Sequence, residues 1–192
     1  MSECLADLLR NQWPIWIGMG GRFGTESVAG LVRNLQCVAS SVEMVLKLEG
    51  LLAPDSFCIQ DKYADTLISG KEIVELFENG PFPPGDKRIK FKQLFFDILD
   101  DCFSSIRREL SQNRFVIVPI ITGNRICHAH VICDFNCGQY RTITKLFGSD
   151  KLINVPDMES RFNENFNQEK NKPTDQRFAT DILVYEKVSP FA

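Results

Sequence analysis

Acid–base and nucleophilic chemistry in this chain can draw on two histidines and seven cysteines. His128 and His130 stand two positions apart, so any step that needs an imidazole must use this one segment. A cysteine becomes a good nucleophile when a helix N-terminus and a neighbouring imidazolium stabilise its thiolate. Cys37 lies in a segment with helical periodicity, well before the histidines, and pairing it with one of them is the chemistry to consider first. A buried structural thiol at Cys37 is the competing interpretation.

The segment around the histidines also contains three cysteines, so a metal site has to be considered. Its metal-capable side chains are Cys127, His128, His130, Cys133 and Cys137. Structural zinc needs four ligands that converge on one point. On a strand, alternate side chains point to opposite faces, which separates the two histidines from Cys127 and Cys133. We therefore expect no metal here.

A glycine-rich segment, Gly18-Met-Gly-Gly-Arg-Phe-Gly24, superficially resembles a phosphate-binding loop. Its spacing misses G-x-G-x-x-G by one residue, and no Lys-Ser/Thr pair follows it. We expect a conformationally permissive turn at this place and no bound cofactor.

The elements that must position these residues follow from periodicity. Apolar residues recur with a helical period from Val28 to Leu48, where Gly50 stops the pattern; whether a break near Asn34–Gln36 divides this helix stays open. Further helices are predicted at Ser69–Asn79 and at Phe91–Gln112, the second with Phe95, Ile98, Leu99, Phe103, Ile106 and Leu110 on its buried side. The β-rich runs are Arg114–Thr122, Ile126–Phe135, Gln139–Phe147 and Phe178–Val188, with a hairpin turn at Asn136–Gly138 and a polar loop or frayed helix at Glu164–Arg177.

This order predicts an α+β fold in one domain over residues 1–192. A helical half (about 1–112) would pack on an antiparallel sheet formed by the β-rich half (about 113–192). A formal charge of −3 and a pI near 5.5 argue against a nucleic-acid binder, and no apolar run is long enough to span a membrane. The first residues lack the features of a secretory signal, and an odd number of cysteines favours free thiols. We therefore expect a cytoplasmic protein in a reducing compartment.

Two segments resemble papain-like cysteine peptidases, in particular the type that processes bacteriocin leaders. Leu35-Gln-Cys-Val-Ala-Ser-Ser-Val-Glu-Met-Val-Leu46 is similar to the helix that begins at the family's nucleophile. The run from Leu110 to Pro119, followed by Cys127-His-Ala-His-Val-Ile132 and the hairpin-like Asp134–Tyr140, is similar to the family's buried strand and its histidine strand.

The resemblance implies a papain-like architecture and assigns roles to individual residues. Cys37 would be the nucleophile, His128 the general base with His130 as the rival, and Gln36 (or Asn34) the oxyanion donor. The strand where the family carries an orienting Asp or Asn holds Thr and Lys here. Asp150 and Asn154 are therefore the nearest substitutes for that role.

Three functions stay open at this point. The leading hypothesis is a papain-like cysteine peptidase or acyl-transfer enzyme that acts on a protein or peptide. The second is a non-enzymatic interaction or assembly module of viral or effector type, which includes an inactive relative of the peptidase fold. A zinc-stabilised module is the third, and the oligomeric state cannot be predicted from the sequence.

Overall fold

The core of the molecule is an antiparallel β-sheet. The computed structural model describes residues 37–56, 58–63, 70–79, 89–122, 126–143, 150–173 and 180–188. Within these residues six strands form one sheet in the order β1-β6-β2-β3-β4-β5, and each neighbouring pair is antiparallel. The strands are β1 (Ile89–Phe95), β2 (Val116–Thr122), β3 (Ile126–Asn136), β4 (Gln139–Ile143), β5 (Asp150–Asn154) and β6 (Asp181–Lys187).

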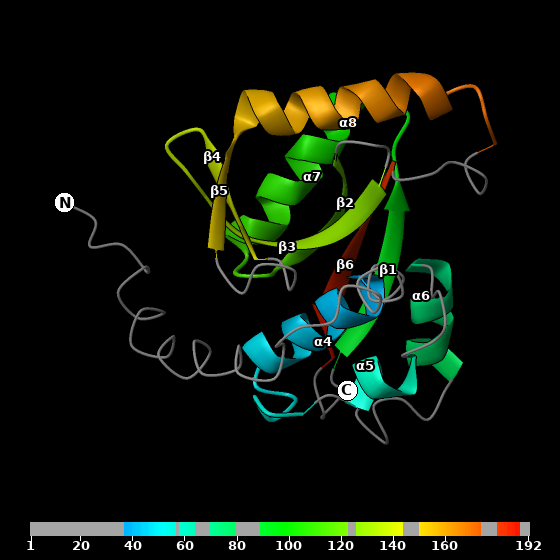
Figure 1. Cartoon of the computed structure of the whole chain (residues 1–192), viewed down its shortest axis with the longest axis vertical. Coiled ribbons are helices and arrows are strands. Elements are labelled where there is room, and N and C mark those ends of the chain that lie inside the picture. The colour runs from blue at the N-terminus through cyan, green and yellow to red at the C-terminus, as the bar shows by residue number, and fades with distance from the viewer. Residues whose placement is uncertain are drawn as a thin grey trace, which may run out of the picture.

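Helices cover both faces of this sheet. One face carries α4 (Cys37–Leu48), α5 (Cys58–Lys62) and α6 (Gly70–Asn79), and the other carries α7 (Leu99–Ser111) and α8 (Val155–Glu169). Figure 1 shows α4 on one side of β3, with α7 and α8 on the other. In the described part of the chain, no helix is both long and apolar enough to cross a bilayer. The α+β class predicted from the sequence is confirmed, with the helices divided between two layers.

Alternation along the strands divides the core into two apolar clusters. Ile117, Ala129 and Val131 pack toward α4 and its neighbours, whereas Val118 and Ile132 pack toward α7 and α8. We call the two sides the α4 face and the α8 face. Because successive strand residues point to opposite faces, a shift of one position moves a side chain from one cluster to the other.

The helix that begins at Cys37 ends as its sequence predicts. Gly50 has a φ of +70°, and the Leu51 N–H donates to the Leu46 carbonyl at 2.8 Å, which closes the last turn of α4. Residues before Cys37 lie outside the described part of the chain, so the question of a helix break near Asn34–Gln36 lies there too.

The predicted helix over Phe91–Gln112 is wrong in its first third. Residues 89–95 form β1, with Ile89 and Phe91 buried and Lys90 exposed between them. Ile98 then adopts an extended conformation, and α7 begins only at Leu99. The apolar residues in this stretch fit both a period of two and a helical period, and pairing with β6 selects the strand. Phe95 and Ile98, predicted to be buried, are exposed.

The stretch Glu164–Arg177 begins inside a helix. The Asn154 side chain caps α8 by accepting the Asp157 N–H at 2.8 Å, and Pro156 lies in the first turn. The hairpin at residues 136–139 is confirmed, with Cys137 and Gly138 both at positive φ. Since β1 precedes α7 and α8 precedes β6, each half of the chain contributes both helix and strand.

Candidate functional site

Helix α4 rests directly on the strand that carries the histidines. Cys37 is the first described residue of α4 and is half-buried against the apolar cluster of the α4 face. One turn further on, the Ser41 hydroxyl donates to the Ala129 carbonyl at 3.2 Å. Ala129 lies between His128 and His130 in β3, so the chain does bring the cysteine helix to the histidine segment.

The histidine rings nevertheless project from the opposite face of the sheet. His130 lies across from Val118 and His128 from Ile120 in the β2–β3 pair. Residues directly opposite each other in an antiparallel pair share a face. Val118 and Ile120 belong to the cluster under α7 and α8, whereas Ala129 and Val131 belong to the cluster under α4. The sheet therefore lies between Cys37 and both imidazoles, and the pair that the resemblance implies is not formed in this structure.

Both histidines are buried, with 8% of His128 and 7% of His130 exposed. Their ring centroids are 6.4 Å apart and the ring planes are nearly perpendicular, at 84°. Burial lowers the pKa of His128, because desolvation disfavours the charged imidazolium. A neutral ring on the far face of the sheet does not supply the imidazolium that would stabilise a thiolate at Cys37.

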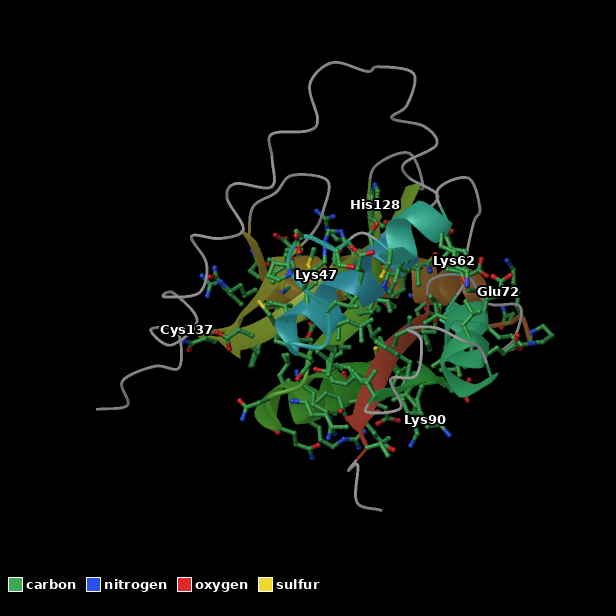
Figure 2. The ribbon with its side chains drawn as sticks, turned by 90° about the horizontal axis from the view of Figure 1, so that it is seen from below. Lys47, Lys62, Glu72, Lys90, His128 and Cys137 are labelled. Atoms are coloured by element: carbon green, nitrogen blue, oxygen red, sulfur yellow. The ribbon has the colours of Figure 1, made fainter. Side chains whose placement is uncertain are left out.

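Of the cysteines near the histidines, the two with described side chains, Cys133 and Cys137, have other neighbours. Figure 2 labels His128 and Cys137 at opposite ends of β3, and the Cys133 thiol donates to the Arg141 carbonyl at 3.4 Å. The Cys127 side chain lies outside the described atoms. Over the described ranges, no group of three or more His, Cys, Asp or Glu side chains could hold a metal ion.

The remaining predicted site residues do not complete a catalytic group in the described part of the molecule. Gln36 lies outside the described residues. Asp150 begins β5 and pairs with Ile143 of β4, and Ile143 pairs with Val131 of β3. Strand β4 therefore lies between the Asp150 backbone and the strand that carries the histidines. The Asp150 side chain is not described, and the Asn154 side chain caps α8.

Ser41 has a structural role that the sequence did not suggest. Pro119 lies opposite Ala129 in the central strand β2, where proline has no N–H to donate across the ladder. The Ala129 carbonyl accepts the Ser41 hydroxyl, so a side chain from α4 satisfies a backbone group in the sheet. The only sequence signal was a proline in an otherwise strand-like run.

The charged residues of α4 also hold neighbouring elements together. Glu43 is fully buried; it pairs with Lys47 at 2.9 Å and accepts the Ile59 N–H at the start of α5 at 3.0 Å. Lys47 is labelled in Figure 2. Just after the helix, Glu49 accepts the Tyr185 hydroxyl, which in turn accepts the Phe115 N–H at 3.0 Å.

The described cysteine side chains are all free thiols. Cys58 and Cys137 are exposed, Cys37 and Cys133 are half-buried, and Cys102 is buried. Burial, together with the nearby Asp181 carboxylate, raises the pKa of Cys102 to about 12, so this thiol stays protonated at neutral pH.

No family model and no curated protein matches this chain. Any functional conclusion therefore depends on the geometry of its own residues.

Proposed function

We propose that this chain is a non-enzymatic protein-binding or assembly module built on a papain-like arrangement of helix and sheet. The element order supports the architectural part: a helix that contains Cys37 packs on an antiparallel sheet whose later strand carries the histidines. Ser41 fixes that helix to the histidine strand. The chain would then be an inactive relative of the peptidase fold.

One observation carries the non-enzymatic part, namely the β2–β3 register. It aligns His128 and His130 with Ile120 and Val118, whose side chains pack on the α8 face, while Cys37 packs on the α4 face. A general base must reach the proton that it abstracts, either directly or through one water molecule. Two buried rings on the far side of a packed sheet do not meet that requirement.

The use of the polar side chains on α4 supports the same conclusion. Ser41, Glu43 and Lys47 are buried. Ser41 donates to β3, Glu43 accepts a hydrogen bond from α5, and Lys47 pairs with Glu43 within α4. Buried polar groups that are satisfied within the fold specify its packing. This part of α4 is therefore suited to holding α5 and the sheet in place.

The proposal is tested by the alkylation rate of each cysteine with iodoacetamide at neutral pH, followed by peptide mass spectrometry on the full chain. Cys58, which is exposed, serves as the internal reference. We expect Cys37 to react no faster than Cys58, and its rate to be unchanged in His128→Asn and His130→Asn variants whose fold is verified by circular dichroism.

The proposal would be overturned if Cys37 were alkylated at least about tenfold faster than Cys58 and if this excess rate disappeared in either histidine variant. That result would support the hypothesis of a cysteine peptidase. Light scattering after size-exclusion chromatography adds a second test. A defined assembly with unreactive thiols supports the module, whereas a monomer with one hyper-reactive thiol contradicts it.

A further inference from the structure

The junction between β2 and β6 has the shortest ladder in the described sheet. These two strands share one ladder pair, Ile117 with Leu183. In contrast, β1 pairs with β6 along its whole length, and β2 does the same with β3. Figure 1 shows β6 between β1 and β2. We call the junction of β2 with β6 the seam, and it depends less on backbone pairing than its neighbours do.

The seam ladder stops on both sides of its single pair. On one side the register places Phe115 opposite Tyr185, but the Phe115 N–H donates to the Tyr185 ring hydroxyl at 3.0 Å. Because the hydroxyl is at the far end of that side chain, Phe115 has left the line of the ladder. On the other side the register places Pro119 opposite Asp181, and proline has no N–H to donate.

Apolar packing holds the middle of the seam. Ile117 and Leu183 belong to the α4-face cluster, and Val184 belongs to the α8-face cluster. Separating the strands along their whole length would therefore expose core side chains on both faces. Movement that costs less is confined to the end of the seam where Phe115 meets Tyr185.

The Tyr185 hydroxyl ties this end of the seam to the segment after α4 (residues 49–52). It accepts the Phe115 N–H and donates to the Glu49 carboxylate. Glu49 also pairs with Lys187 at 2.5 Å, so one carboxylate holds two side chains of β6. Burial, together with the hydrogen bond to Glu49, raises the pKa of Tyr185. The hydroxyl therefore keeps its proton at neutral pH and can donate to Glu49 while it accepts from Phe115.

We propose that the hydrogen-bond chain from Phe115 through Tyr185 to Glu49 is a latch, which couples the position of the segment after α4 to opening at the end of the seam. With Glu49 in place, the Tyr185 hydroxyl stays where it accepts the Phe115 N–H. A contact that moves Glu49 frees the hydroxyl, and the start of β2 then separates from the end of β6. The coupling is reciprocal, so separation of these strand ends also releases Glu49.

The test is hydrogen exchange of individual backbone amides, measured by NMR on the full chain. In Tyr185→Phe the Phe115 amide loses its acceptor, and we expect it to exchange about tenfold faster. In Glu49→Ala the acceptor is still present, and we expect a similar increase because the Tyr185 ring is no longer held. Exchange of the β1 amides should stay unchanged in both variants, because the long β1–β6 ladder does not depend on the latch.

Two further variants separate the latch from a general loss of stability. Glu186→Gln is the matched control: Glu186 follows Tyr185 in β6, is exposed, and pairs with Lys92 of β1 instead of with the segment after α4. It should leave the Phe115 exchange rate unchanged. The double variant E49A/Y185F should exchange no faster at Phe115 than Tyr185→Phe alone, because both substitutions act through one hydroxyl.

An unchanged Phe115 exchange rate in Glu49→Ala would overturn the proposal, because the segment after α4 would then not control the seam. Additive effects in the double variant would also overturn it. So would an equal increase that extends to the β1 amides in both single variants, since that result would indicate lower global stability instead of local opening. None of these outcomes depends on the reactivity of Cys37, so this inference is tested separately from the proposed function.

Discussion

His128 and His130 differ from Ala129 by one position, and that offset decides which face of the sheet their side chains occupy. Ala129 and Val131 lie under α4, so their neighbours in sequence must lie under the other helical layer. The spacing of two between the histidines keeps both rings on one face, 6.4 Å apart. Since that face is the α8 face and Cys37 packs on the α4 face, both rings lie away from Cys37.

The burial of His128 predicts that acid destabilises the fold. Its pKa is lowered by desolvation from the ordinary value of 6.5, so the unfolded state takes up the proton at a higher pH than the folded state does. As the pH falls below about 6.5, the unfolded state binds more protons and the free energy of unfolding decreases. Urea midpoints measured from pH 7.5 to about 5.5 should therefore fall.

His128→Asn is the control for this pH dependence, and the decrease should be smaller in that variant. Asp181 acts in the opposite sense, because burial raises its pKa and the folded state therefore takes up its proton at a higher pH than the unfolded state does. An equal pH dependence of the midpoint in wild type and in His128→Asn would contradict a buried neutral His128.

At the scale of elements, a side-chain hydrogen bond adds to the apolar packing between α4 and β3, at a point where β3 lies opposite a proline. Ser41→Ala should destabilise the fold by about 1–3 kcal/mol, because the buried Ala129 carbonyl loses the hydroxyl that satisfies it. Thermal or urea unfolding measures this loss. Ser40→Ala, a neighbouring buried serine, should cost less. Equal losses in the two variants would show that the Ser41–Ala129 bond does not stabilise the docking of α4.

The elements that the sequence predicts well are those with strong local signals. The apolar period and Gly50 specify α4, and the β-branched runs with their Asn-Cys-Gly turn specify β3 and β4. The stretch 89–98 carries no such signal, because its apolar residues fit two periods. Pairing with β6, which lies far along the chain, decides its conformation.

The candidate site was harder to predict, because it depends on which face of a strand packs under which helix. Alternation along β3 is readable in the sequence, and in the structure it separates the histidines from Ala129 and Val131. The sequence does not say that α4 would cover the face of Ala129. That choice comes from tertiary packing, in which Val42 and Val45 of α4 share a cluster with Val131.

At the scale of the molecule, the sheet divides the chemistry-bearing residues into two layers. Cys37 and the buried Glu43–Lys47 pair belong to the layer of α4, and the histidines and Cys102 belong to the layer of α7 and α8. A core packed on both faces of a sheet does not let side chains exchange layers without unfolding.

The most direct test of this account is the distance from the Cys37 sulfur to the nearest ring nitrogen of His128 or His130, measured in a crystal structure of the full chain. The account predicts that the sheet separates the atoms, with the sulfur against the apolar cluster of the α4 face and both rings beside Val118 and Ile120. A separation within about 4 Å on one face of the sheet would contradict it and would establish the geometry of a cysteine–histidine enzyme.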